Sequence, residues 1–282
     1  MIYMSTGGVK GKKASSVAEE YVLNGIKNVE LSAGIYIEDP EKELNELRKS
    51  CSFLLHNYFP VPQESFVLNL ASLDDEVFSK SFEHVKESIR LSGLFGCKYY
   101  SFHAGFLLDP KPRELGKGLA KNIFFDRDKS IERFIMAVNK LSLLANKVGV
   151  KLLIENNVFS KTNFERFDEN PFLLSDVNGI GEIFDHIDDA AMLLDVAHLK
   201  VSSNVLGFEC KDFIEVSYNF VQAYHLSDND GFEDTNKSFN ETAWFWKHIR
   251  RDLDYYTIEV YDDNVDNLVQ QYNLVNEFLE AE

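Results

Sequence analysis

Short apolar runs and amphipathic stretches alternate eight times along this chain, and no other feature limits its possible folds as strongly. The apolar runs are rich in Val, Ile, Leu, Phe and Tyr, as is typical of strands buried on both faces of a parallel sheet. A strand–helix unit repeated eight times predicts an α/β fold, a single (β/α)8 barrel, with an open doubly wound sheet as the alternative. The predicted strands are Ile2–Ser5, Asn28–Leu31, Ser52–His56, Tyr99–His103, Lys151–Asn156, Ala191–Asp195, Val221–His225 and Thr257–Tyr261.

The stretches between these strands carry helical patterns, several of them with recognisable ends. Asp39 is a predicted N-cap with Pro40 in the first helical position, and Gly96 and Gly149 are predicted to end two long helices. The predicted helices are Ala14–Ile26, Pro40–Ser50, Asp75–Phe95, Asp128–Lys147, Ile180–Ile187, Lys211–Tyr218, Glu241–Asp252 and Asn264–Leu279. Because no linker or break in composition divides the chain, we predict one domain over residues 1–282.

Composition narrows the class of protein further. A hydrophobic fraction of 45% supports a large core and argues against disorder. The three cysteines, Cys51, Cys97 and Cys210, lie far apart and outside any CxxC pattern, so they predict neither a disulfide framework nor a cysteine zinc site. We find no signal peptide and no apolar run long enough to span a membrane, and we expect a reducing, cytoplasmic location.

The charge balance bears on the partner. The chain has 46 acidic and 29 basic residues, a net charge of −17, and such a field repels polyanions at long range. This disfavours nucleic acid as a partner, although a local basic groove could still bind it.

Ionisable side chains cluster at the ends of the predicted strands. In a barrel of this kind the carboxyl ends of all strands face one mouth, where catalysis normally occurs. The polar residues at or just after these ends are His56, His103, Glu155, Asn156, Asn157, Asp195, His198, His225, Asp228, Asp230 and Glu259. Glu30, at the end of the second strand, either points into the mouth or forms a structural ion pair.

A single strand-end histidine is readily explained as a buried structural residue, but so many ionisable groups in one mouth need a neutralising partner. A bound divalent cation is the simplest one, and mixed carboxylate and imidazole ligands suit Zn, Mn, Co or Fe, with Mg also open. The other histidines, His84, His186 and His248, lie on predicted helices beside charged residues, so we expect them at the surface.

The motifs LLIEN, LLDVAH, YHLSD and TIEVY together resemble the xylose isomerase-like barrels, a superfamily of sugar isomerases and epimerases that also includes the endonuclease IV type of nuclease. The resemblance covers nearly the whole chain in strand order. In the epimerases of this family one metal is held by a Glu, an Asp, a His and a Glu from the fifth to eighth strands. The matching residues here are Glu155, Asp195, His225 and Glu259.

The endonuclease branch holds three metals, and this chain matches that pattern only in part. His56 in LLHNYFP and His103 in SFHAG match the two early histidines, which with Glu155 imply a second metal position. The third position needs the D-x-x-H histidine, here His198, and a later D-x-H pair. Asp234 matches the aspartate of that pair, but Asn236 replaces its histidine and is a much poorer zinc ligand.

The resemblance implies proton transfer beside the carbonyl of a sugar or sugar phosphate. The metal would act as a Lewis acid and stabilise the enediolate, while Glu155 and Glu259 remove and return the proton. His198, Asp228 and Asp234 are the expected substrate-binding residues. The alternatives are an endonuclease IV-like phosphodiesterase, dehydration of a cyclic polyol, and a non-catalytic barrel that binds a sugar.

Three segments leave open interpretations. Lys111, Arg113, Lys117 and Lys121 could hold a substrate phosphate, or they could lie in a solvated loop. Phe159, Phe164 and Phe167 could belong to a lid, or they could pack their loop onto the barrel. Trp244 and Trp246 could form the face of a homo-oligomer, or they could be core residues of the helix predicted over Glu241–Asp252.

Overall fold

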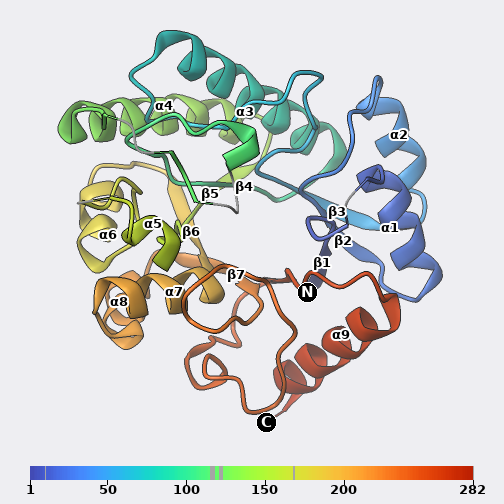
Figure 1. Ribbon diagram of the computed structural model, residues 1–282. Helices are drawn as coiled ribbons and strands as arrows, with labels where there is room; N and C mark the ends of the chain where they lie inside the picture. Colours follow the sequence, from blue (N-terminus) through green and yellow to red (C-terminus); the bar gives the residue numbers. More distant parts are fainter. Residues whose placement is uncertain (10, 115–117, 121–122, 168, 282) are drawn as a thin grey trace.

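The computed structural model describes residues 1–9, 11–114, 118–120, 123–167 and 169–281. Eight parallel strands close into one barrel in which each strand pairs with its neighbours in sequence and β1 pairs with β8 (Figure 1). This confirms the predicted (β/α)8 barrel. The strands are β1 Ile2–Ser5, β2 Asn28–Leu31, β3 Ser52–His56, β4 Tyr99–His103, β5 Lys151–Glu155, β6 Ala190–Asp195, β7 Val221–Leu226 and β8 Tyr255–Ile258.

Helices surround the barrel on its outer side (Figure 1). They are α1 Ala14–Leu23, α2 Pro40–Leu47, α3 Asp75–Phe95, α4 Arg127–Lys147, α5 Lys161–Phe164, α6 Val177–Phe184, α7 Val196–Leu206, α8 Cys210–Ser217 and α9 Val265–Glu280. The predicted caps are confirmed: the side chain of Asp39 accepts a hydrogen bond from the Lys42 amide at 2.9 Å, and Gly96 ends α3 at a φ of 73°. None of these helices combines the length and apolarity that a membrane crossing requires.

The α-helix predicted over Glu241–Asp252 is wrong. Across residues 240–254, all of which the structure describes, the only helical element is a 3-10 turn at Trp246–His248. Aromatic packing holds the segment in place without a longer helix: the Trp246 ring lies 4.3 Å from that of Phe278 on α9, and its indole nitrogen donates to the Asn240 carbonyl at 2.7 Å. Trp246 therefore packs within its own chain, and the predicted homo-oligomer stays a prediction.

Helix α7 was not predicted, although its sequence carries clear end signals. The side chain of Asp195 accepts from the His198 amide at 2.7 Å and so caps the N-terminus, and Gly207 ends the helix at a φ of 78°. The helix begins directly at the end of β6, and its first turn therefore carries His198 at the mouth of the barrel. One aspartate thus serves both as the end of a strand and as a helix cap.

Two apolar clusters support the mouth. The main core runs through all eight strands, which are buried almost throughout. A smaller cluster under the loops that follow β3, β4 and β5 consists of Val67, Phe106, Leu108, Leu119, Phe159, Phe167 and Phe172. Phe159 and Phe167 are therefore packing residues rather than lid contacts, whereas Phe164 is half exposed.

Candidate metal centre

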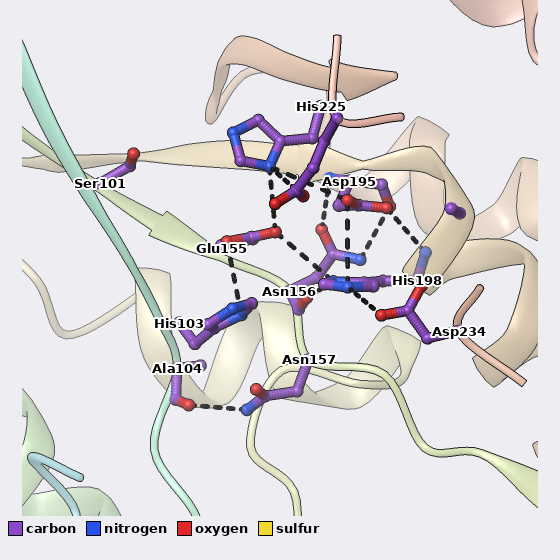
Figure 2. Close-up of polar contacts among 12 residues, drawn as sticks. Ser101, His103, Ala104, Glu155, Asn156, Asn157, Asp195, His198, His225 and Asp234 are labelled. Atoms are coloured by element: carbon purple, nitrogen blue, oxygen red, sulfur yellow. Dashed lines mark hydrogen bonds and ion pairs between the residues drawn. The ribbon is translucent and has the colours of Figure 1, made fainter. Parts of the chain in front are cut away.

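Four strand ends bring Glu155, Asp195, His225 and Glu259 together at the barrel mouth. Figure 2 shows the first three of these side chains pointing toward one another. Each of the four residues offers one ligand atom, and these atoms all lie within 4.8 Å of one another. All four side chains are buried. The parallel register produces this grouping, because β6 pairs Asp195 with His225 on β7, and Glu259 directly follows β8.

The atoms converge on His225 Nδ1. It lies 3.1 Å from Glu259 Oε2, 3.4 Å from Glu155 Oε1 and 3.9 Å from Asp195 Oδ2. Among the described residues, both Glu155 oxygens and Asp195 Oδ2 lack a hydrogen-bond partner despite being buried. Buried, unpaired carboxylate oxygens are costly unless a cation neutralises them, so this donor set fits a divalent metal.

Asn156 fixes the position of Asp195. Its side-chain carbonyl accepts from the Asp195 amide at 2.8 Å, and its amide nitrogen donates to the Asp195 carbonyl at 3.0 Å. With Oδ1 of Asp195 already capping α7, only Oδ2 remains free to face the cluster.

His56 and His103 contact the other oxygen of Glu155 and form a second group with it. His56 Nε2 lies 3.4 Å and His103 Nδ1 lies 3.3 Å from Glu155 Oε2. The two oxygens of Glu155 therefore face different groups, as a carboxylate bridging two cations would. His56 Nδ1 is held by Ser101 Oγ at 2.8 Å.

His198 lies between the first group and a cavity. Its Nδ1 is 2.9 Å from the Asn156 carbonyl, which can only accept, so Nδ1 carries the hydrogen. Its Nε2 lies 3.3 Å from Asp234 Oδ2 and 3.9 Å from Asp195 Oδ2. His198 and Asp234, both expected to contact substrate, thus face one another at the mouth (Figure 2).

Asn236, at the position of the missing third-metal histidine, has a different contact. It is buried with a φ of 42°, and its amide nitrogen donates to the Glu259 carbonyl at 3.1 Å. The backbone carbonyl of Asn236 accepts a hydrogen bond from the Tyr261 amide at 2.8 Å. In this arrangement Asn236 supports the backbone on both sides of Val260 and holds Glu259 in place.

The structure places Asp228 away from the centre. Its Oδ1 lies 2.6 Å from the ammonium of Lys200, and its backbone pairs with that of Lys237. Asp228 is also absent from the described walls of the cavity beside the metal centre.

That cavity has a volume of about 700 Å³. His103 of the second group, His198 and Asp234 line it together with apolar side chains, which include Phe66, Val67, Phe106 and Phe172. Of the four basic residues considered for phosphate, Lys111 and Arg113 are exposed and do not line it. Lys117 and Lys121 lie outside the described residues.

The charges in the centre shift one another's pKa values. Burial alone would raise the pKa of Glu155, but the neighbouring His103, His225 and His56 outweigh it and hold this pKa well below its ordinary value. Burial raises the pKa of Asp195 to about 7. Burial lowers the pKa of His103 to about 4, which leaves it neutral and available as a ligand.

His84 and Glu30 are both buried. The first differs from its prediction, and the second decides between two interpretations that the sequence left open. His84, expected at the surface, is buried, and its Nε2 lies 3.0 Å from the Asn57 carbonyl because α3 packs that face against the loop after β3. Glu30 forms the ion-pair contact rather than lining the cavity: it is buried, with Oε2 3.1 Å from His225 Nε2.

With this fold and this site, the chain belongs to the xylose isomerase-like TIM barrel family, which matches residues 25–271. A stretch of 133 residues is 26% identical to the probable endonuclease 4 of Thermotoga maritima; it covers 47% of this chain but only 38% of that protein.

Solved structures of epimerases and of a zinc-soaked protein share the fold. A D-tagatose 3-epimerase-like protein aligns with a TM-score of 0.73 and 16% identity over 99% of this chain and 97% of the other. An L-ribulose 3-epimerase aligns with a TM-score of 0.63 and 17% identity over 96% and 86%. A Thermus thermophilus protein, from a crystal soaked with ZnCl2, aligns with a TM-score of 0.60 and 18% identity over 98% of both chains. At these identities the likeness shows the fold alone.

Proposed function

We propose that this protein is a divalent-metal-dependent isomerase or epimerase of a sugar or sugar phosphate. The observation that carries the proposal is the buried group of Glu155, Asp195, His225 and Glu259 with its unpaired carboxylate oxygens. Three carboxylates and one imidazole supply the ligands that Zn, Mn, Co, Fe or Mg accepts. The epimerase structures that share the fold support the choice of substrate class.

The bound cation would supply Lewis acidity toward two neighbouring oxygens of the substrate. Glu155 and Glu259 carry the proton. They reach the centre from β5 and from the end of β8, and neighbouring histidines, in each case against the effect of burial, lower the pKa of both carboxyls. Both are therefore ionised at neutral pH, so either can accept the proton that leaves the substrate carbon. The other can return a proton only after it has taken one up from solvent, and the first carboxyl then releases its proton to solvent. Return to the same carbon gives epimerisation, and return to the neighbouring carbon gives isomerisation.

His198 positions the substrate in this proposal. Because its Nδ1 hydrogen is committed to the Asn156 carbonyl, its Nε2 is directed toward Asp234 and the cavity. A substrate oxygen entering from the cavity would meet His198 and Asp234 before it reached the carboxylates. Burial alone would lower the pKa of His198, but Asp195 and Asp234 outweigh it and hold this pKa well above its ordinary value, so Nε2 also carries a hydrogen. His198 can therefore donate to a substrate hydroxyl while Asp234 accepts from it.

Exchange of solvent deuterium into a panel of ketoses, measured on the metal-loaded protein by NMR, tests the proposal. We expect incorporation of deuterium at a carbon next to the carbonyl, and loss of that incorporation when the metal is removed by a chelator. Absence of exchange with every ketose and ketose phosphate, in protein that has bound its cation, would contradict the proposed function.

Phosphodiester cleavage is the second candidate. The group of His56, His103 and Glu155 favours it, as does the local similarity to an endonuclease 4. The contact of Asn236 with the Glu259 backbone and the net charge of −17 count against it. Incubation with an oligonucleotide that contains one abasic site separates the two functions, because only the second predicts strand cleavage.

A further inference from the structure

Glu30 is a buried carboxylate in contact with His225 of the candidate metal centre, and the proposed chemistry does not use it. It lies on β2, whereas the four ligands come from β5 to β8. Its Oε2 is 3.1 Å from His225 Nε2 and 3.1 Å from Thr257 Oγ1. Its Oε1 has no hydrogen-bond partner within the described residues. The contact with His225 crosses the barrel interior, since β2 and β7 are not neighbours in the sheet.

The two nitrogens of His225 face opposite partners. Nδ1 faces Glu259 and Glu155, and Nε2 faces Glu30. An ionised carboxylate can only accept, so a hydrogen bond to Glu30 requires hydrogen on Nε2. Nδ1 lies equally close, at 3.1 Å, to Glu259 Oε2, but a cation in the centre takes the lone pair of Nδ1, and the ring then keeps its hydrogen on Nε2 toward Glu30.

We infer that Glu30 is a positioning residue for the metal centre. It keeps the ring of His225 oriented with Nε2 protonated, and its negative charge makes Nδ1 a stronger electron donor toward the cation. A carboxylate behind a metal-bound histidine has this effect in metal sites generally. The inference rests on the cation site of the proposed function and adds to it a requirement from the opposite side of the barrel.

Thr257 gives Glu30 its own orientation. Its hydroxyl donates to the oxygen that also accepts from His225, and it lies on β8 two residues before Glu259. Two other histidines of the site have neutral partners at one ring nitrogen: His56 contacts Ser101 Oγ, and His198 contacts the Asn156 carbonyl. Glu30 therefore adds negative charge behind His225, the ligand whose Nδ1 faces all three carboxylates of the first group.

Glu30 could also be a ligand itself, because ligand atoms of Glu30, His56 and His225 lie within 4.8 Å of one another. The contacts of His56 count against that reading. Its Nδ1 is held by Ser101 at 2.8 Å, and its Nε2 lies 3.4 Å from Glu155 Oε2 in the group with His103, so a cation on His56 is assigned to that group.

The test compares Glu30→Gln with wild-type protein and with Ser101→Ala, a matched control that removes the neutral partner of His56. Zn²⁺ is titrated into metal-free protein against a competing chelator. We expect Glu30→Gln to weaken the tighter Zn²⁺ site by about 10- to 100-fold, and we expect Ser101→Ala to leave that site unchanged. Thr257→Val, which leaves both His225 and Glu30 intact, should weaken it in the same direction by a smaller factor.

A spectroscopic readout separates positioning from a general loss of stability. Long-range ¹⁵N–¹H spectra of the zinc-loaded protein should show His225 protonated at Nε2 in the wild type and a weakened or altered Nε2 signal in Glu30→Gln. Unfolding of each metal-free variant establishes that it is folded; if Glu30→Gln is not, the comparison of Thr257→Val with wild type decides.

Equal zinc affinity and an unchanged His225 signal in folded Glu30→Gln would overturn the inference while leaving the proposed function intact. Loss of one whole equivalent of zinc with the tighter site unaffected would also overturn it, because Glu30 would then be a ligand. Wild-type protein that binds no cation would instead contradict the proposed function itself.

Discussion

The ends of β5 and β6 and the loop that follows β7 contain the same kinds of residue, Asp, Glu and Asn, in opposite surroundings. In the loop, Asp228 pairs with Lys200, and Asn236 donates to the Glu259 carbonyl. At the strand ends, both oxygens of Glu155 and one of Asp195 are buried with no hydrogen-bond partner among the described residues. Asp228 and Asn236 thus have their partners within the protein, whereas the strand-end carboxylates leave oxygens directed at a common point. A site that binds an ion must keep carboxylate oxygens free of hydrogen bonds to the protein, whereas a structural loop needs no such free oxygens.

The largest expected effect comes from substitution of the glutamates at the candidate metal centre. We predict that Glu155→Gln and Glu259→Gln each lower turnover by at least about 10²- to 10⁴-fold, because an uncharged amide cannot accept the substrate proton. Deuterium exchange and product formation measure the loss, and a chelator-competition titration establishes whether the variants still bind the cation. Turnover close to wild type in either variant would remove that residue from the catalytic pair.

A smaller effect should follow from substitution of His103, which belongs to the second group only. Under the proposed function one tightly held cation is sufficient, so His103→Asn should retain that cation and keep most of the isomerase activity. Metal analysis of the purified proteins checks this. Two tightly bound ions in the wild type, together with loss of one ion and of all activity in His103→Asn, would favour the phosphodiesterase alternative.

Loss of the Asp228–Lys200 ion pair should change the stability of the protein without changing its turnover. Asp228→Asn breaks the partly exposed pair with Lys200 and should lower the free energy of unfolding by about 1 kcal/mol or less, with turnover unchanged. Urea denaturation measures the first quantity, and a double-mutant cycle with Lys200→Met isolates the pair. A raised KM with unaltered stability would instead place Asp228 among the substrate-binding residues, as its position after β7 first indicated.

The smallest effect concerns His84, a buried histidine outside the metal centre. Burial lowers its pKa below the ordinary value of 6.5, so the unfolded chain takes up a proton before the folded protein does. The contribution of His84 to stability is therefore present above pH 6.5 and is lost as the pH falls below it. We expect urea denaturation of metal-free protein between pH 5 and 8 to show a weaker dependence on pH for His84→Gln than for wild type. Identical pH profiles would contradict this assignment.

Much of the fold followed from local patterns. The periodicity of apolar residues identified all eight strands to within a few residues at each end, because strands buried on both faces leave short, continuous apolar runs. Two errors mark the limit of such patterns. The segment around Trp246 has helical periodicity, yet aromatic contacts with α9 hold it as a 3-10 turn. Helix α7 was missed although Asp195 and Gly207 mark its ends, because its first residues were assigned only to the end of a strand.

Most of the candidate metal centre could be predicted in the same way. In a closed parallel barrel all carboxyl ends of strands meet, so residues at those ends are neighbours whatever their separation in sequence. That rule placed Glu155, Asp195, His225 and Glu259 at the mouth with other polar residues, and the structure brings their ligand atoms within 4.8 Å of one another, although the family resemblance was needed to single out these four. The rule could not predict where the Asp228 side chain points, because the pairing with Lys200 depends on how the loop after β7 folds back onto α7.

The sequence by itself determined the barrel and the residues at its mouth, since both follow from local periodicity and from the order of the strands. Only the tertiary structure decided which atoms face one another: the shared oxygens of Glu155, the contact of Asn236 with the Glu259 backbone, and the position of Glu30 behind His225. Glu30 and His225 are separated by 195 residues and lie on strands that do not pair. A contact across the barrel interior depends on closure of the whole sheet, and no local pattern in the sequence records it.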